Sequence, residues 1–253
     1  MSASGAKAFR TVAFGEVEGG LWGAAVDAGA DGIVGLALGS AAGRATVAGD
    51  ALQWSEDGRG WCLTGDGVQL RVQPRGQPPA EADGEAAESE VSGLQELCHV
   101  HGMVSIAGAE CPVDCAGTRT EVDGMQPGSI ASARGVSGFF EGDEALTLLA
   151  LRSRRAAEHN ADLVAATLFD PDRWLPVADP RLSTTYTGAG EPSRTSLELW
   201  VGDGESEFPR RAAGESAGPV AALSAGELAL RVTPLRCHSR GLEGAGVYVL
   251  ARF

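Results

Sequence analysis

Five short blocks occur twice in this chain in the same order, and this repetition restricts the fold more than any other feature. The paired blocks are EGGLWGAAV (18–26) with EGDEALTLLAL (141–151), DGIVGLAL (31–38) with DLVAATLF (162–169), WSEDG (54–58) with WVGDG (200–204), VQLRVQP (68–74) with LALRVTP (228–234), and CHVHG (98–102) with CHSRG (237–241). Each match is short, but the shared order predicts a tandem duplication of one unit.

The repeated unit has the sequence character of a β-structure. Its segments are short, alternate apolar and polar residues or carry β-branched ones, and are separated by Gly, Asp-Gly and Pro. Glycine contributes 36 of the 253 residues, about twice its usual share of roughly 7%. The helix-prone stretch 143–159 is expected to contain a strand, because its repeat partner LWGAAVD forms helices poorly. We predict an all-β protein with two tandem antiparallel units, each a β-barrel or β-sandwich.

The second unit is expected to begin near residue 129, which divides the chain into domains 1–128 and 129–253. The acidic segment GQPPAEADGEAAESE at 76–90 has no counterpart in the second copy. Its composition is typical of a flexible loop inside the first unit, not of a domain linker.

Charge and composition exclude several classes of function. The formal net charge of −14 argues against nucleic acid and anionic membranes as partners. Lys7 is the one lysine, so Schiff-base and P-loop chemistry are not expected. No secretory segment and no apolar run of membrane-spanning length occurs, and the five cysteines are an odd number. We expect a cytoplasmic protein with reduced thiols and no membrane insertion.

Two successive β-units of this length, with Trp- and Gly-rich strands, resemble the tandem lipocalin-like proteins that include carotenoid hydratases and related cyclases. The resemblance implies two antiparallel barrel-like halves around an apolar site. It also implies an enzyme that adds water to hydrophobic polyenes, or cyclises them, without an organic cofactor.

The block CHVHG offers one candidate site. In a strand, His99 and His101 point to one face while Cys98 and Val100 point to the other. Two such imidazoles can bind a metal if a third ligand comes from another strand. Candidates for that third ligand are His159, His238, Glu96 and Glu110. A zinc site built from Cys98, Cys111 and Cys115 is a weaker alternative, and we expect buried, inert thiols and no metal.

The two copies of this block differ at one informative position. Cys98, His99 and Gly102 recur as Cys237, His238 and Gly241, so they are expected to serve the fold, with the glycine at a bulge or a close backbone approach. His101 is replaced by Arg240 in the second copy. We therefore predict His101 as a catalytic acid or base and Arg240 as an electrostatic partner of the substrate.

Carboxylates and aromatic residues supply the other candidates. Glu16 and Glu198 lie in apolar strands and are predicted to be buried acids with a catalytic role. An apolar ligand-binding pocket is expected to be lined by the rings of Trp22, Trp54, Trp200, Tyr186, His99 and His238.

These observations lead to one principal hypothesis and two alternatives. The principal hypothesis is a cofactor-independent hydratase, cyclase or isomerase that acts on a terpenoid or polyketide-like substrate by proton transfer. The first alternative is a carrier or sensor that binds an apolar ligand without chemistry. The second is a metal-dependent enzyme that uses His99 and His101.

Overall fold

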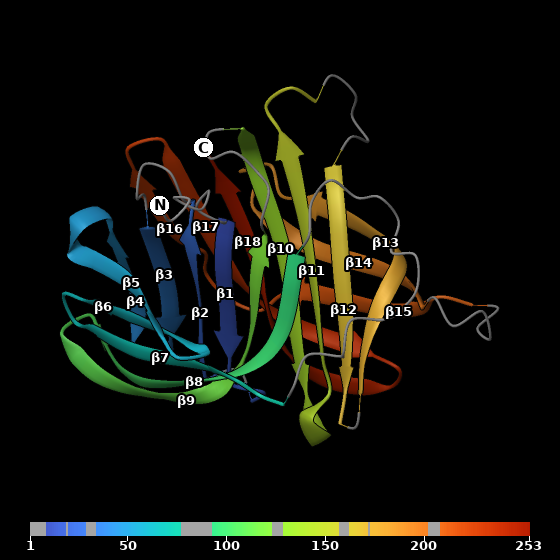
Figure 1. Cartoon of the computed structure of the whole chain (residues 1–253), viewed down its shortest axis with the longest axis horizontal. Helices are drawn as coiled ribbons and strands as arrows, with labels where there is room; N and C mark the ends of the chain where they lie inside the picture. The colour runs from blue at the N-terminus through green and yellow to red at the C-terminus, as the bar shows by residue number, and fades with distance from the viewer. Residues whose placement is uncertain are drawn as a thin grey trace, which may run out of the picture.

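The fold is described from a computed structural model, which describes residues 9–253 apart from 19, 29–33, 77–92, 123–128, 157–161, 172 and 202–207. Eighteen strands form two nine-stranded antiparallel sheets (Figure 1). Each sheet curls into a barrel around its own core. The only helical segments among the described residues are two 3₁₀ turns, so the prediction of an all-β fold with two tandem units is confirmed.

The first sheet comprises the nine strands of the N-terminal unit. They are β1 (Phe9–Gly15), β2 (Leu21–Asp27), β3 (Val34–Ser40), β4 (Gly43–Ala48), β5 (Leu52–Asp57), β6 (Gly60–Gly65), β7 (Val68–Pro74), β8 (Gly93–Ile106) and β9 (Ala109–Val122), with the 3₁₀ turn η1 (Gly49–Ala51) between β4 and β5.

The second sheet comprises the nine strands of the C-terminal unit. They are β10 (Ile130–Phe140), β11 (Ala145–Ser153), β12 (Asp162–Asp170), β13 (Arg173–Tyr186), β14 (Pro192–Val201), β15 (Arg210–Ser216), β16 (Ala221–Ala225), β17 (Leu228–Ser239) and β18 (Leu242–Arg252), with the 3₁₀ turn η2 (Glu141–Asp143) between β10 and β11.

Both sheets follow the same path around a barrel. The first strand of each unit pairs with its last, β1 with β9 and β10 with β18, and the other neighbours follow chain order. The sheets differ in where this path is interrupted. The N-terminal sheet ends at β4 and β5, whereas the C-terminal sheet is interrupted between β15 and β16 and is closed by pairing of β15 with β17.

For four of the five repeated blocks, the described strand residues lie on strands with the same place in the two units. The exception is VQLRVQP, which forms the seventh strand β7, whereas LALRVTP begins the eighth strand β17. That pairing of blocks is therefore wrong. In the first copy the block lies on the strand beside CHVHG, with Pro74 opposite Cys98, while in the second it precedes CHSRG on a single strand.

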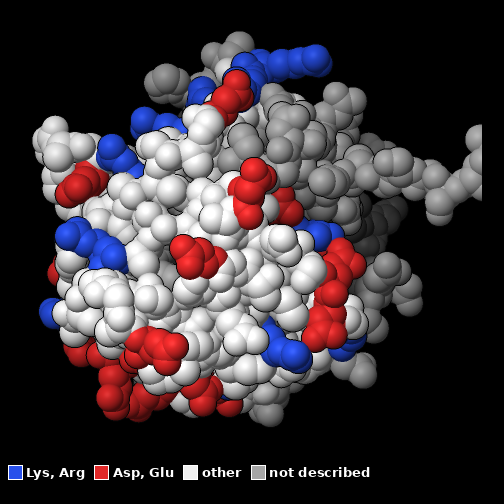
Figure 2. Space-filling view, turned by 90° about the vertical axis from the view of Figure 1, so that its left-hand side faces the viewer, with Lys and Arg blue, Asp and Glu red and all other residues white. Residues whose placement is uncertain are grey.

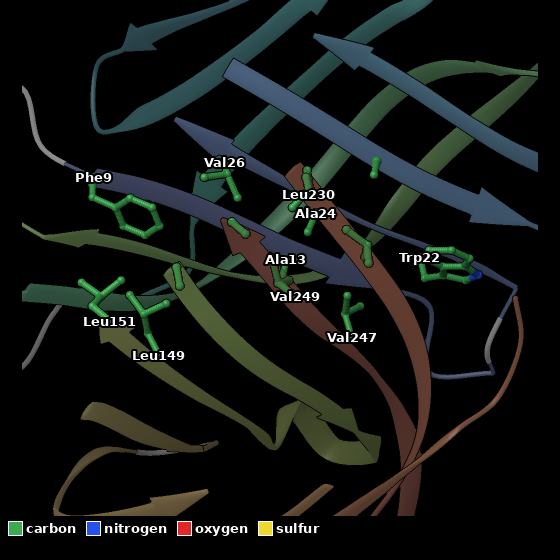
Figure 3. Close-up of a cluster of buried hydrophobic side chains, with 14 of the residues drawn as sticks. Phe9, Ala13, Trp22, Ala24, Val26, Leu149, Leu151, Leu230, Val247 and Val249 are labelled. Carbon is green, nitrogen blue, oxygen red and sulfur yellow. The ribbon is translucent and has the colours of Figure 1, made fainter. Parts of the chain in front are cut away.

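The buried apolar residues form three cores. One fills the N-terminal barrel around Phe14 and Leu63, and another fills the C-terminal barrel around Leu148 and Tyr248. The third lies between the units and combines β1–β3, β8 and β9 of one with β10–β12 and β16–β18 of the other (Figure 3). Labelled members of this third core are Phe9, Ala13, Trp22, Ala24, Val26, Leu149, Leu151, Leu230, Val247 and Val249.

Strands at this interface are buried on both faces, which explains their sequences. In β11, Leu146 and Leu148 point into the C-terminal barrel while Leu149 and Leu151 point toward the N-terminal unit. A strand covered on both sides carries a nearly continuous apolar run instead of an alternating one. This is why the stretch 145–153 resembles a helix by composition, although it is a strand, as predicted.

Hydrogen bonds between buried polar side chains also join the units. The Oγ1 atom of Thr118 on β9 lies 2.6 Å from the Oγ atom of Ser137 on β10. Gln95 on β8 accepts a hydrogen bond from Thr167 at 2.8 Å and donates one to the carbonyl oxygen of Ala165 at 3.3 Å. Because buried polar groups need partners, these bonds favour one relative arrangement of the two sheets.

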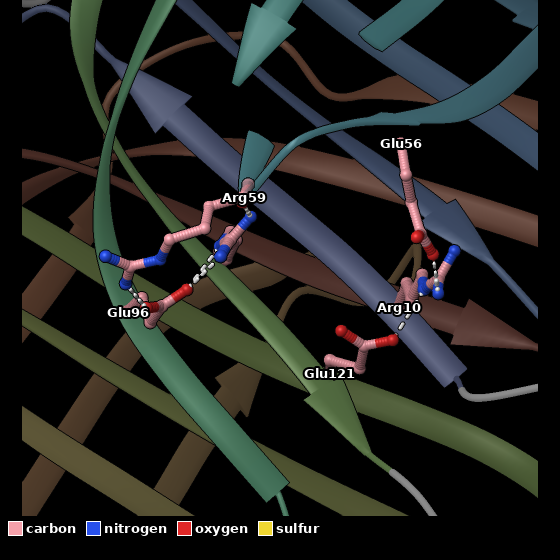
Figure 4. Close-up of polar contacts among 6 residues, drawn as sticks. Arg10, Glu56, Arg59, Glu96 and Glu121 are labelled. Atoms are coloured by element: carbon pink, nitrogen blue, oxygen red, sulfur yellow. Dashed lines mark hydrogen bonds and ion pairs between the residues drawn. The ribbon is translucent and has the colours of Figure 1, made fainter. Parts of the chain in front are cut away.

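The N-terminal barrel also contains buried charge (Figure 4). Glu96 is fully buried and accepts hydrogen bonds from Arg119, with an Nε–Oε2 distance of 2.6 Å. Arg59 approaches the other carboxylate oxygen at 3.2 Å, and the Arg119 guanidinium lies 4.7 Å from the centre of the Trp61 ring. Each charge thus has an opposite partner, as burial requires.

Several predictions concern surface or location and remain predictions. On the face in Figure 2, Asp and Glu gather along the lower edge while arginines are dispersed. No helix within the described residues has the length and apolar character of a membrane span. Residues 77–90 of the acidic loop, Lys7, His159 and residue 128 lie outside the described residues. The partners, the cytoplasmic location and the division into domains at 128/129 stay predictions.

Candidate functional site

A cleft of about 400 Å³ opens between the two units, and we call it the first cleft. Its floor is apolar and comes from both units, with Leu97 and Ala116 on β8 and β9 and Phe139 and Ala145 on β10 and β11. Its remaining lining residues are Glu16, Val17, Glu18, Arg75, His99, Asp114, Cys115, Phe140, Asp143 and Glu144. Seven of the fourteen lining residues carry a carboxylate, arginine or imidazole side chain, so charged and polar groups surround the apolar floor.

Glu16 lies at this cleft, directly after β1. Its backbone N–H donates to the carbonyl oxygen of Leu21 at 2.9 Å, and its carboxylate accepts the Leu21 N–H at 3.1 Å. A Cβ atom at Gly20 would overlap the Glu16 carboxylate, so only glycine leaves space for this arrangement. The β1–β2 turn thereby fixes the carboxylate at the cleft, although it is half-buried and not enclosed.

His99 lies in the same cleft and is held by Asp114. Its Nε2 atom is 2.5 Å from Oδ1 of Asp114, which lies on the neighbouring strand β9. The His99 side chain is 31% exposed and that of Asp114 is 80% exposed. A carboxylate on one ring nitrogen orients the imidazole and directs proton exchange to the other nitrogen, Nδ1.

His101 stands beside His99 but does not line the cleft. The two rings are stacked with centroids 5.1 Å apart, and Cys98 and Val100 point into the barrel core, so the predicted division of the two faces is confirmed. The Nδ1 atom of His101 is buried and has no hydrogen-bond partner. His101 therefore packs against the His99 ring. It does not contact the space of the first cleft.

Two of the predicted third metal ligands, Glu96 and His238, do not lie beside these histidines. Glu96 is inside the barrel with Arg119, and His238 belongs to the other sheet. Across the described part of the chain, no group of three or more His, Cys, Asp or Glu side chains is arranged to hold a metal ion.

Three of the five cysteines are buried thiols, as predicted. Cys98, Cys115 and Cys237 are buried, whereas Cys62 and Cys111 are partly exposed. Burial raises the pKa of Cys115 to about 12, with a further contribution from the nearby Glu16 carboxylate. Burial also raises the pKa of Cys98 above its ordinary value and that of Cys237 to about 12. These thiols are poor nucleophiles at neutral pH.

The predicted buried position of Glu198 is wrong. Glu198 is on the outer face of β14 with 41% of its side chain exposed, and its carboxylate lies 3.4 Å from Arg211. Leu197 and Leu199, its neighbours in sequence, point into the barrel instead. The apolar strand was identified correctly, but its alternation puts Glu198 on the solvent side.

His101 and Arg240, the position at which the two copies were predicted to differ, lie in different kinds of structure, and neither lines the first cleft. His101 lies inside the long strand β8, which continues to Ile106. Arg240 is exposed in the turn between β17 and β18 and has a positive φ of 53°. The β17–β18 hairpin turns where the β8–β9 hairpin continues, so the two side chains have unrelated surroundings.

The two glycines of the repeated block differ in the same way. A Cβ atom at Gly102 would overlap the carbonyl oxygen of Gln69 on β7, which confirms the predicted close backbone approach. Gly241 instead adopts a positive φ of 81° in the hairpin turn after Arg240.

The other predicted ligand-binding residues are distributed over the molecule. Trp22 lies in the core between the units, and Trp54 packs against Trp61 with ring centroids 5.1 Å apart. The hydroxyl of Tyr186 is 2.9 Å from that of Tyr248 in the C-terminal barrel. The remaining two are Trp200, whose Nε1 atom is buried without a partner, and His238, whose Nδ1 atom is 3.8 Å from Glu243. Of the predicted site residues, only Glu16 and His99 line the first cleft.

Sequence reasoning missed Asp114, Arg75 and Phe139. Asp114 could have been found, because a two-residue turn at 107–108 brings it opposite His101 and diagonal to His99. Arg75 and Phe139 have no such local pattern. Arg75 reaches Asp143 of the other unit at 2.6 Å, a contact that only the packing of the two units creates.

Comparison with known proteins gives structural matches alone. No protein-family model and no curated protein matches the sequence. A protein from Nitrosomonas europaea described as an AttH candidate superposes with a TM-score of 0.59 and 12% identity, covering 97% of this chain and 92% of that one.

Two further solved structures have the same architecture. CghA with Sch210972 superposes with a TM-score of 0.65 and 12% identity, covering 98% of this chain and 89% of that one. Kievitone hydratase from Nectria haematococca superposes with a TM-score of 0.61 and 9% identity, covering 98% and 89%. At 9–12% identity, these similarities show that the chain shares its two-barrel fold with these proteins over almost its whole length.

Proposed function

We propose that this protein is a cofactor-independent enzyme of the hydratase or cyclase type, which transfers protons to and from an apolar, unsaturated substrate in the first cleft. One observation carries the proposal: an apolar floor built by both units lies beside Glu16 and the Asp114-bound His99. The shared fold with kievitone hydratase supports it at the level of the family.

The floor is suited to bind the substrate by its apolar surface. Leu97, Ala116, Phe139 and Ala145 line the cleft, and its volume of about 400 Å³ is within the range of sites for small molecules. Binding there would remove part of an alkene from bulk water.

The proposed reaction begins with a proton. The His99 imidazolium, oriented by Asp114, donates its Nδ1 proton to one carbon of a carbon–carbon double bond, and the π electrons form the new C–H bond. The neighbouring carbon becomes a cation, which the Glu16 carboxylate stabilises electrostatically.

The cation formed in this first step can react in two ways. In hydration, a water oxygen bonds to the cation and its extra proton returns to His99, so the product gains one water molecule. In cyclisation, a second double bond of the substrate attacks the cation and an adjacent C–H proton passes to His99, so the product is an isomer. Neither outcome consumes an oxidant or a reductant.

Deuterium incorporation tests the proposal. The protein is incubated in D₂O with linear prenyl alcohols, and the products are analysed by mass spectrometry. An enzyme of this type introduces deuterium at carbon, because the transferred proton comes from solvent. We expect His99→Gln and Glu16→Gln to lower the rate of incorporation by about a hundredfold or more, whereas Glu198→Gln, the matched carboxylate control on the outer face, retains it.

A carrier would give a different result in the same experiment. It would bind the alcohols and release them without deuterium at carbon in the wild type. Equal incorporation by the wild type and both cleft variants would also contradict the assignment of the site.

A further inference from the structure

Four arginines face the inside of the C-terminal barrel at the end where β18 stops. Their strands carry the inward-pointing core residues Val136, Leu148, Leu235 and Leu250. Residues an even number of positions away on the same strand point the same way. We call the four arginines at such positions the arginine strip, and they are Arg134 on β10, Arg152 on β11, Arg231 on β17 and Arg252 on β18.

The pairing of the strands makes this strip continuous. β17, β18, β10 and β11 are neighbours in the sheet in this order. Arg231 lies opposite Leu250, and Arg252 is two residues further along that strand. The same diagonal step relates Arg252 to Arg134 and Arg134 to Arg152. Diagonal neighbours are roughly 7 Å apart at Cβ, so the long arginine side chains can reach one shared ligand.

One half of the strip is oriented by a carboxylate. Asp162 on β12 accepts a hydrogen bond from Arg152 at 3.3 Å through one oxygen and a hydrogen bond from Arg134 through the other. The Asp162 side chain is only 9% exposed, whereas each of the two arginine side chains is 31% exposed. A nearly buried aspartate thus holds two guanidinium groups at the end of the barrel.

The other half of the strip has no acidic partner within the described part of the chain. Arg231 and Arg252 are both exposed, and Arg231 donates to the carbonyl oxygen of Gly190 at 3.5 Å. Glu227, in the turn before β17, pairs with Arg154 at 3.3 Å instead. Like charges on neighbouring strands repel, so an anion bound among these arginines would stabilise the arrangement.

Two tyrosines beside the strip add hydroxyl groups. The hydroxyl of the fully buried Tyr248 lies 2.9 Å from that of Tyr186, and Arg134 is close enough to interact electrostatically with both. Tyr186 is 41% exposed. Val164 is 36% exposed, although it points to the same face of β12 as the core residue Ala166. Solvent therefore reaches inward-facing residues at this end of the barrel.

From this arrangement we propose that the arginine strip binds a small anion that carries phosphate groups. The planar guanidinium group matches phosphate oxygens with two parallel hydrogen bonds, and several arginines together balance a group with two or three negative charges. The strip lies at the opposite end of β10 and β11 from the η2 turn and the first cleft (Figure 1). The proposal is therefore independent of the reaction proposed above.

Titration with inorganic diphosphate, followed by isothermal titration calorimetry at low salt, tests the proposal. We expect Arg231→Gln and Arg252→Gln each to weaken binding by about tenfold or more, because each removes a charged hydrogen-bond donor. Arg236→Gln is the matched control. Arg236 is also exposed on β17, but it is an odd number of residues from Arg231 and points to the other face. This control should bind diphosphate within about twofold of the wild type.

Thermal unfolding without ligand shows whether each variant is folded, and exposed positions should leave the unfolding temperature unchanged. Failure of the wild type to bind diphosphate would overturn the proposal. Equal weakening by Arg236→Gln would also overturn it, since only the total charge would then matter. Citrate tests the ligand class, because it carries similar charge on carboxylates. Binding of citrate as tight as that of diphosphate would contradict the assignment to phosphate.

Discussion

In both barrels, a cysteine, a glycine and a phenylalanine on three neighbouring strands lie side by side in one row. The N-terminal row is Cys98, Gly117 and Phe14, and the C-terminal row is Cys237, Gly244 and Phe140. In the parallel row that lies two residues away on each of these strands, the two barrels carry different residues. The N-terminal barrel has Glu96, Arg119 and Val12, and the C-terminal barrel has Leu235, Gly246 and Gly138.

The comparison separates residues that serve the duplicated fold from residues that one copy uses alone. His99 and His238 follow the shared cysteines, and each has a carboxylate partner on the next strand, Asp114 or Glu243. Only His99 lines a cleft covered by the other unit. A residue that both copies share thus gains a candidate role in one copy because of what packs over it.

The largest expected effect is a loss of stability when the charged row of the N-terminal barrel, which contains Glu96 and Arg119, is changed. Glu96→Leu should destabilise the protein by about 3–5 kcal/mol, because it leaves the buried Arg119 guanidinium without its carboxylate partner. Adding Arg119→Leu should restore part of that loss, since the second barrel shows that this row can be apolar. Urea denaturation measures both variants, and a double variant no more stable than Glu96→Leu would contradict the interpretation.

The next effect concerns the two histidines. His99→Gln should lower the rate of deuterium incorporation by about a hundredfold or more, the usual contribution of a general acid or base. His238→Gln should leave the rate within about twofold of the wild type, because His238 does not line the first cleft. Comparable losses in the two variants would show that the shared histidine acts through the fold.

The cysteines of the shared row, Cys98 and Cys237, should make equal contributions to the pH dependence of stability. The raised pKa of the Cys98 and Cys237 thiols means that the folded protein keeps both protons while unfolded thiols ionise above about pH 8.5. The free energy of unfolding should therefore fall as pH rises, by about 2 kcal/mol per thiol at pH 10.

Cys98→Ala and Cys237→Ala should each flatten the stability profile between pH 8 and about 10 by the same amount. Urea unfolding at several pH values measures the slope. A profile altered by only one of the two substitutions would indicate that the rows are not equivalent.

The smallest effect is expected for Glu198. Glu198→Gln removes an exposed ion pair with Arg211, so the free energy of unfolding should change by less than about 0.5 kcal/mol. Thermal unfolding measures this change. A loss of several kcal/mol would mean that the outer face of β14 is covered in solution.

Much of the fold could be predicted from the sequence, because the repeats and the alternation within strands are local patterns. Strand β10, whose residues include Gly135, Ser137 and Gly138, was not predicted. Ser137 is a poor indicator of a strand by itself, and in the fold it is buried with its hydroxyl beside those of Thr118 of the other unit and Thr147 on β11. Its position in the fold depends on a contact that the local sequence does not contain.

The candidate site was predicted less completely. Glu16 and His99 were identified, whereas the roles assigned to His101 and Arg240 depended on counting three residues from the shared cysteines. The same residue count leads to different kinds of structure because the two hairpins turn at different points, at Ala107 in one copy and at Arg240 in the other.

The sequence by itself determined the strand class, the duplication and the face of each strand that is apolar, since these follow from periodicity and repetition. The tertiary structure decided which outer faces meet. That packing brings Phe139 and Ala145 of one unit to the same cleft as Leu97 and His99 of the other. The physical reason is that a cleft between two barrels depends on contacts between residues far apart in the chain, for which no local pattern exists.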